Sequence, residues 1–191
     1  MTNAPLQKRY IDAQSLLEDS FQLAVNIFNS GYRPRLIIGI WRGGTPVGIA
    51  VQEYFEYRGT STDHIAIRAA SYTGINQQSD TIRVYGLDYV AENTGHDDAL
   101  LLVDDVFDSG RSMETVIKTL SGMTGADCRE RIRIACPWYK PDNNKTGLVP
   151  DYYLHETGDW LVFPHELAGL TREEIAAGKP ALAQILKKGE Q

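Results

Sequence analysis

The sequence predicts an α/β protein with a mainly parallel central sheet flanked by helices. Short apolar runs of strand length alternate with segments whose apolar residues recur at helical spacing. Two such runs, at residues 36–40 and 100–103, end abruptly in polar loops that contain glycine and lead into a helix. Continuous apolar runs are typical of strands buried on both faces, and open α/β sheets bind ligands at the carboxyl ends of such strands. The loop that follows residues 100–103 is therefore where we expect the ligand.

The first expected helix follows Asp12, a residue type that commonly caps helices, and ends at Gly31. Its apolar stripe consists of Leu16, Leu17, Phe21, Ala24, Ile27 and Phe28. The stripe predicts a structural helix, and we assign it no chemistry.

The strand at 36–40 is followed by Arg42, by the glycine pair 43–44 and by a helix whose first turn accommodates Pro46. Paired glycines after an arginine allow a backbone to approach an anion closely. A tight turn with an exposed arginine is the other interpretation, and from these residues alone it is the favoured one.

A strand at 64–69 leads into residues 71–80, which are polar, contain glycine and lack core anchors. This composition predicts a mobile loop. A return strand is expected at 82–85, and a charged, solvated turn at 92–98 precedes the central strand.

The central strand at 100–103 leads into Asp104 and Asp105, then into residues 108–112. The following helix has the apolar stripe Met113, Val116, Ile117 and Leu120. At the start of a helix, backbone N–H groups lack intrahelical partners and the helix dipole adds partial positive charge, so this turn predicts a phosphate site.

Asp104 and Asp105 would repel a phosphate bound in that same turn. They are better suited to accept hydrogen bonds from sugar hydroxyls, with a divalent cation nearby to balance their charge. The loop therefore predicts a sugar phosphate as the ligand. The plainer alternative is that Asp108 and Ser109 only cap the helix while the acid pair is solvated.

The rest of the chain carries weaker signals. A further strand is expected at 131–136, and Thr171 with Glu174 forms a capping box at the start of a helical tail. Cys128 and Cys136 have no metal-binding or disulfide spacing and are expected to be buried, reduced thiols.

The segment VDDVFDSGRSM at 103–113 resembles the phosphoribosyl-pyrophosphate motif of the type I phosphoribosyltransferases. It is most similar to the 6-oxopurine enzymes, which act on hypoxanthine, guanine or xanthine and carry an aspartate at the position of Asp108. Asp104 departs from the glutamate that many members have, and Arg111 departs from their lysine or glycine. The resemblance covers about residues 10–166. It implies a type I phosphoribosyltransferase fold in one domain, 1–191, with a small base-binding hood at about 137–166 and a helical tail at 167–191.

The resemblance also implies a site for phosphoribosyl pyrophosphate. Its expected residues are Arg42, Gly43, Asp104, Asp105, Asp108, Ser109, Gly110, Arg111 and Ser112. Arg42 and Gly43 would hold pyrophosphate, and the resemblance suggests a cis peptide bond between them. Ser71 and Tyr72 would be the first residues of a catalytic lid, which closes and excludes water.

For the purine, the resemblance implies contacts from Lys140, Trp160 and Leu161. Lys140 would donate to the 6-oxo group, since an ammonium has only donors and mismatches the amino group of adenine. Trp160 would stack on the base, and Leu161 would present its backbone. Without the resemblance, Trp160 and Leu161 are ordinary core candidates, and Lys140 is an exposed residue at a strand end.

Three acids, Asp104, Asp105 and Glu166, would lie at a Mg²⁺ ion. Asp108 would be the catalytic residue, accepting or holding the N7 proton as the base attacks. The implied reaction transfers the 5-phosphoribosyl group to N9 of a 6-oxopurine and releases pyrophosphate, a step of purine salvage. The expected partners are thus phosphoribosyl pyrophosphate and a purine base, in a homodimer or homotetramer.

A nucleotide-sensing regulator that binds RNA or DNA on the same fold is the alternative. The net charge of −6 argues against it and against binding to anionic membranes. A phosphohydrolase would need D-x-D where Asp104 and Asp105 are adjacent, and a P-loop kinase would need G-x-x-x-x-G-K-[ST], which is missing. With no apolar run near ~20 residues and no apolar signal core, the expected location is the cytoplasm.

Overall fold

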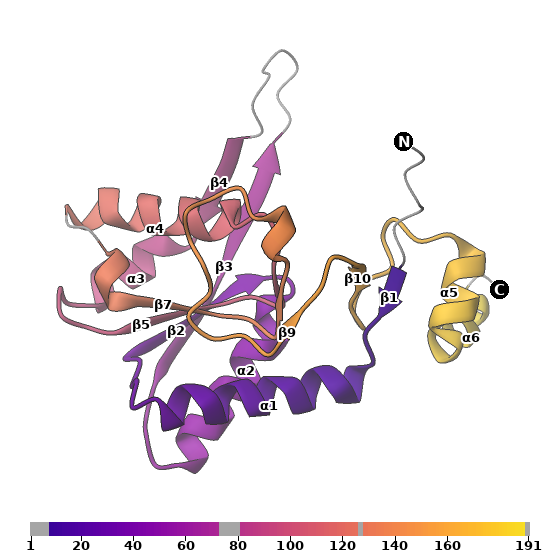
Figure 1. Ribbon diagram of the computed structural model, residues 1–191, viewed down its shortest axis with the longest axis horizontal. Helices are drawn as coiled ribbons and strands as arrows, with labels where there is room; N and C mark the ends of the chain where they lie inside the picture. The colour runs from indigo at the N-terminus through magenta and orange to yellow at the C-terminus, as the bar shows by residue number, and fades with distance from the viewer. Residues whose placement is uncertain (1–7, 73–80, 126–127, 190–191) are drawn as a thin grey trace. The chain divides into compact units, whose positions relative to one another are not determined.

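The computed structural model describes residues 8–72, 81–125 and 128–189 (Figure 1). The chain divides into two compact units, one formed by residues 14–158 and the other by its two ends, up to residue 13 and from residue 159 onward. The boundary after Gly158 falls within the segment 137–166, and the single domain with its hood stays a prediction.

The larger unit is built on a five-stranded sheet with the strand order β4-β3-β2-β5-β7. Its strands are β2 (Leu36–Trp41), β3 (Asp63–Tyr72), β4 (Thr81–Tyr85), β5 (Leu100–Val103) and β7 (Ile132–Ala135). All neighbouring pairs are parallel except β3 and β4, where the chain returns antiparallel. The expected α/β class with a mainly parallel sheet is confirmed, as is the return strand.

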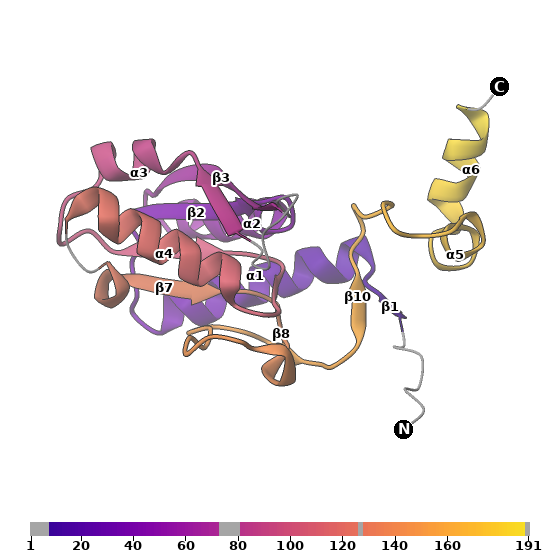
Figure 2. The ribbon, with the colours of Figure 1, turned by 90° about the horizontal axis from the view of Figure 1, so that it is seen from above.

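Helices cover both faces of this sheet (Figures 1 and 2). They are α1 (Ala13–Asn29), α2 (Gly44–Tyr57), α3 (Leu87–Asn93) and α4 (Arg111–Thr124). The side chains of β2 alternate between the faces because successive residues of a strand point in opposite directions. Leu36, Ile38 and Ile40 join the core beneath α3 and α4, whereas Ile37 faces α2.

Two helices differ from the sequence-based expectation. The last residues of helix α3 overlap the start of the charged turn expected at 92–98. Leu87 and Val90 anchor this helix in the core, but two apolar residues are too few to show a helical period in the sequence. In α1, Leu17 and Phe21 are exposed by 45% and 38%, and the buried side instead includes Ser20. The Ser20 hydroxyl is satisfied by donating to the carbonyl of Leu16 at 2.6 Å.

A second, three-stranded parallel sheet lies beyond the ends of β5 and β7. It consists of β6 (Val106–Phe107), β8 (Trp138–Tyr139) and β9 (His155–Glu156). The register places Phe107 opposite Tyr139. Asp108 and Lys140, the residues that follow, are therefore neighbours although 32 positions separate them in sequence. Short 3₁₀ turns occupy Arg129–Arg131 and Pro141–Asn143.

The smaller unit pairs β1 (Lys8–Tyr10) in parallel with β10 (Trp160–Val162) and ends in α5 (Arg172–Gly178) and α6 (Pro180–Lys188). The predicted capping box is confirmed: the Thr171 side chain accepts from the backbone of Glu174, whose side chain accepts from the backbone of Thr171.

Cys128 and Cys136 are buried thiols, as expected. In the part of the chain that the structure describes, every helix is too short or too polar to span a bilayer.

Candidate functional site

The loops that follow β2 and β5 meet at the carboxyl end of the sheet, because these two strands are neighbours. The glycine pair makes this contact possible. A Cβ added to Gly44 would lie 2.2 Å from the carbonyl oxygen of Val103, and one added to Gly43 would lie 1.8 Å from the Oδ2 atom of Asp105. The paired glycines thus have a role that the sequence did not reveal, which is to let the first loop lie directly against the acid pair.

The cis peptide bond of this loop joins Trp41 and Arg42. The bond raised between Arg42 and Gly43 is therefore displaced by one residue, a correction to the sequence-based expectation. Trp41 and Arg42 are both exposed, and the loop closes with a hydrogen bond from the backbone N–H of Thr45 to the carbonyl of Arg42 at 3.2 Å.

The acid pair lies directly after β5. Asp105 is only 8% exposed, and its backbone N–H donates to the Oδ1 atom of Asp104 at 3.0 Å. Burial raises the pKa of the Asp104 carboxyl well above its ordinary value, and the neighbouring Asp105 carboxylate raises it further. Backbone hydrogen bonds from Asp105 and Gly44 offset only part of this. Ionisation of Asp104 next to Asp105 is therefore unfavourable, and a nearby cation would favour it.

The turn that is predicted to bind phosphate lies at the start of α4. Gly110 occupies the N-cap with a φ of +75°, in the left-handed region that favours glycine, and it has no side chain to cap the helix. The backbone N–H of Arg111 donates to the Oγ atom of Ser109 at 3.4 Å. A Cβ at Gly110 would also lie 2.5 Å from the Oγ1 atom of Thr146. The turn borders a cavity of about 210 Å³ lined by Asp104, Asp105, Val106, Phe107, Asp108, Ser109, Gly110, Ser112 and Met113. A helix start that faces a cavity can bind an anion.

Asp108 and Lys140 form an ion pair beside this cavity. The Nζ atom of Lys140 lies 3.1 Å from the Oδ2 atom of Asp108, and the lysine is only 8% exposed. Its backbone N–H donates to the carbonyl of Phe107 at 2.9 Å, in continuation of the β6–β8 pairing. The plain interpretation of Lys140 as an exposed residue at a strand end is therefore wrong.

Asn143 is a third member of this group and was not predicted. The Nδ2 atom of Asn143 donates to the Oδ1 atom of Asp108 at 2.9 Å, so each carboxylate oxygen has a donor of its own. No sequence pattern marks Asn143. Its position depends on the turn at Pro141–Asn143, which the β6–β8 pairing brings against the loop.

The lid prediction falls mostly outside the described residues. The backbones of Ser71 and Tyr72 end β3, where they pair with Ile82 and Thr81 of β4. Residues 73–80 lie outside the described ranges. The lid stays a prediction.

Trp160, Leu161 and Glu166 belong to the smaller unit. Trp160 is 55% exposed on β10, and Leu161 is buried. Glu166 accepts a hydrogen bond from the backbone N–H of Phe163 at 3.0 Å. Burial lowers the pKa of Lys179, and the Glu166 carboxylate opposes that shift. The purine and metal roles expected of these three residues stay predictions.

The donor set for a metal ion is small. Across residues 8–72, 81–125 and 128–189, no group of three or more His, Cys, Asp or Glu side chains gathers as a metal site. Two adjacent carboxylates nevertheless suit Mg²⁺, which commonly binds to one or two protein carboxylates and takes its remaining ligands from water and substrate phosphates. Asp104 and Asp105 fit that type of site.

The fold is a mainly parallel α/β sheet with an acid pair and a helix start at its carboxyl edge, and in open α/β sheets this edge is where ligands commonly bind. The sequence profile of the phosphoribosyl transferase domain matches residues 7–168, most of the chain. The chain therefore belongs to the phosphoribosyltransferase family, and its sheet has the type I fold of that family.

Solved structures agree with this assignment. A purine phosphoribosyltransferase from Pyrococcus horikoshii is 29% identical with a TM-score of 0.64, over 86% of this chain and 97% of its own. A hypothetical protein from Neisseria gonorrhoeae with bound ppGpp is 21% identical with a TM-score of 0.68, over 96% of this chain and 99% of its own. The xanthine-guanine-hypoxanthine phosphoribosyltransferase of Helicobacter pylori is 20% identical with a TM-score of 0.65, over 82% and 92%.

Proposed function

We propose that this protein transfers the 5-phosphoribosyl group of phosphoribosyl pyrophosphate to N9 of a 6-oxopurine. The N9–C1′ bond forms as the bond from C1′ to pyrophosphate breaks, and the products are a nucleoside monophosphate and pyrophosphate. The family membership supports the reaction class. The pairing of Lys140 with Asp108 beside the cavity carries the proposal for the base.

The donor sugar would bind along the loop from Asp104 to Ser112. Its 5-phosphate fits the start of α4, where Ser109, Gly110, Arg111 and Ser112 offer backbone and side-chain donors. Its diol fits Asp104 and Asp105, since carboxylates accept hydrogen bonds from hydroxyls. When bound, Mg²⁺ would neutralise charge on the departing pyrophosphate. Asp104 and Asp105 would hold it, with Glu166 as the third expected acid.

The base would lie beside Asp108 and Lys140. An ammonium has three donors, so Lys140 can donate to the carboxylate of Asp108 and to a 6-oxo group at the same time. The amino group of adenine at that place would be a poor match. Asp108 would accept the N7 proton as N9 attacks. Trp160 would stack on the ring, and the backbone of Leu161 would contact its edge.

The leaving group would be held on the opposite side of the sugar. Arg42, exposed on the loop after β2, would bind pyrophosphate together with the backbone at Gly43. Ser71 and Tyr72 would close over the reacting atoms and exclude water.

A pyrophosphate-release assay with phosphoribosyl pyrophosphate, Mg²⁺ and each of hypoxanthine, guanine, xanthine and adenine tests the proposal. We expect turnover with at least one 6-oxopurine and none with adenine. Turnover with adenine alone, or with none of the four bases, would contradict it. Sedimentation of the same preparation checks the expected homodimer or homotetramer.

The role of Asp108 has its own test. Asp108→Asn should reduce kcat by at least about 100-fold, the usual worth of a positioned acid or base. Calorimetry should find the affinity for phosphoribosyl pyrophosphate largely unchanged. An equal loss of kcat and of affinity would show that Asp108 only supports the structure of the phosphate loop. A gel shift with RNA and DNA at physiological salt separates the enzyme from the regulatory alternative.

A further inference from the structure

Two donors at the two ends of one short turn hold the Asp108 carboxylate. Lys140 precedes the turn Pro141–Asn143 and contacts Oδ2 at 3.1 Å, while Asn143 ends it and contacts Oδ1 at 2.9 Å. The turn itself is closed by a hydrogen bond from the backbone N–H of Asn143 to the carbonyl of Lys140 at 3.2 Å. The two donors thus lie at a fixed spacing that matches the two oxygens of one carboxylate.

The segment that carries this turn is tied to the phosphate loop on both sides of it. Before the turn, the backbone N–H of Lys140 donates to the carbonyl of Phe107 at 2.9 Å. After it, the backbone N–H of Lys145 donates to the carbonyl of Ser109 at 3.0 Å. Asp108 lies between those two carbonyls in sequence. The side-chain contacts of Asn143 and Lys140 therefore act on a carboxylate whose backbone is already positioned.

A carboxylate held by one donor can still rotate about its Cβ–Cγ bond. Separate donors on its two oxygens remove that freedom, and each oxygen keeps a second lone pair for a further donor. Asn143 is also uncharged, so it orients Asp108 without competing with Lys140 for charge. A fixed carboxylate with free lone pairs is what a proton acceptor needs, because misplacement by about 1 Å can cost 100-fold in rate.

We propose that Asn143 is a positioning residue for the attack of the base, acting through Asp108. This rests on the proposed function, in which Asp108 takes the N7 proton. Asn143 orients the carboxylate toward the base, and the Lys140 ammonium keeps donors for the 6-oxo group. The neighbouring asparagine serves a different purpose: the Asn144 amide donates to the carbonyl of Leu148 at 2.7 Å and its Oδ1 accepts from the backbone N–H of Thr146 at 2.9 Å.

These adjacent asparagines provide matched variants. For Asn143→Ala we expect kcat to fall about 10- to 100-fold, with an unchanged melting temperature and an affinity for phosphoribosyl pyrophosphate within about twofold of the wild type. For Asn144→Ala we expect the melting temperature to fall while kcat of the folded protein stays near the wild-type value. Asn143→Gln, which keeps an amide donor, should recover part of the lost kcat.

The decisive measurement repeats Asn143→Ala in an Asp108→Ala background. If Asn143 acts through Asp108, the second change lowers kcat no further. Independent, multiplicative losses overturn the inference, as does a kcat for Asn143→Ala equal to that of the wild type. Wild-type protein that releases no pyrophosphate with any of the four bases would instead defeat the proposed function and, with it, this inference.

Discussion

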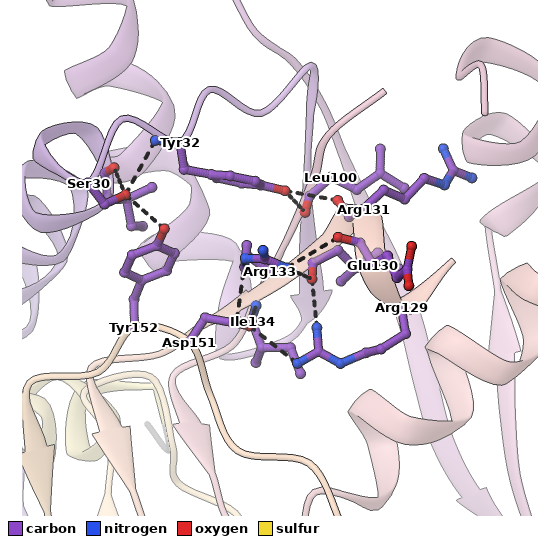
Figure 3. A network of polar contacts seen from close by, with 12 residues as sticks. Ser30, Tyr32, Leu100, Arg129, Glu130, Arg131, Arg133, Ile134, Asp151 and Tyr152 are labelled. Carbon is purple, nitrogen blue, oxygen red and sulfur yellow. Dashed lines mark hydrogen bonds and ion pairs between the residues drawn. The ribbon is translucent and has the colours of Figure 1, made fainter. Parts of the chain in front are cut away.

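Polar side chains gather at both ends of the central sheet, but the balance of their charges differs. At the amino ends of β5 and β7, the Tyr32 hydroxyl lies 2.7 Å from the carbonyl of Leu100 and 2.9 Å from that of Arg131 (Figure 3). Nearby, Asp151 lies 3.7 Å from Arg129 and 3.5 Å from Arg133, and it accepts from the backbone N–H of Ile134 at 2.8 Å. Opposite charges meet there, and the hydroxyl contacts backbone carbonyls.

At the carboxyl end, like charges meet instead. Asp104 and Asp105 are adjacent, and burial and this proximity raise the pKa of the Asp104 carboxyl. The loop borders a cavity of about 210 Å³. A polar cluster that neutralises itself stabilises the fold, whereas one that needs an external cation or donor indicates a binding site. The amino-end cluster therefore has the character of a structural cluster, and the carboxyl-end pair has that of a candidate binding site.

The largest effect is expected from Gly44→Ala, since the added Cβ would lie 2.2 Å from the backbone oxygen of Val103. The loop would have to move away from the acid pair. We expect a loss of about 3 kcal/mol in the free energy of unfolding, measured in urea, together with a loss of activity of more than about 100-fold.

Gly48→Ala is the matched control in the same helix. Its Cβ would meet the Cα of Gly39 and the Cγ2 of Ile37 at 3.9 Å each, which are ordinary contacts. Stability should stay the same or rise, because alanine favours helices. Equal behaviour of the two variants would show that the glycine pair does not support the carboxyl-end site.

Asp151→Ala comes next. It leaves two arginines and the backbone N–H of Ile134 without this acceptor, so we expect a loss of about 2 kcal/mol in unfolding free energy with kcat unchanged. Asp97→Ala, at a fully exposed acid, should change neither quantity. A drop in kcat for folded Asp151→Ala would assign the amino-end cluster a functional part.

Tyr32→Phe should cost about 1 kcal/mol near pH 8, where the lost hydrogen bonds decide the outcome. Burial raises the pKa of Tyr32 to about 12, above the ordinary value of 10.0. The unfolded chain therefore releases this proton at lower pH than the folded one, and the wild type loses stability as pH rises from 10 to 12. The Tyr32→Phe variant should lack this pH-dependent loss of stability. The advantage of the wild type in unfolding free energy, measured in urea, should therefore shrink over this range. A difference in unfolding free energy that stays constant over this pH range would contradict the prediction.

The last change should raise stability instead of lowering it. Asp104→Asn replaces a carboxyl group whose ionisation burial and Asp105 make unfavourable, while the side-chain oxygen can still accept from the backbone N–H of Asp105. We expect a gain of about 1 kcal/mol at pH 7, with loss of activity. Because the folded-state pKa is raised, the gain should grow as pH rises above the ordinary value of 3.8 and vanish in acid, where both side chains are neutral. Destabilisation at pH 7 would place the pair among the structural clusters.

The features that were predictable are local in sequence. The run from 100 to 103, the acid pair and the helix stripe from Met113 to Leu120 lie within one strand–loop–helix unit, so their pattern predicts their arrangement. The resemblance implied that Lys140 and Asp108 both act on the purine, but their direct contact was not predicted, because it depends on the β6–β8 pairing. Asn143 could not be found, since a single asparagine in a turn carries no periodicity.

By itself the sequence determined the α/β class, the mainly parallel sheet and the loop at 104–112, because burial period, glycine conformation and helix-start chemistry are properties of short segments. The tertiary structure alone decided that Gly43 and Gly44 contact the acid pair, that the cis bond precedes Arg42, and that Asn143 and Lys140 share the oxygens of Asp108. These are contacts between segments distant in sequence or details of backbone geometry. They are set by strand order and register, which no local pattern encodes.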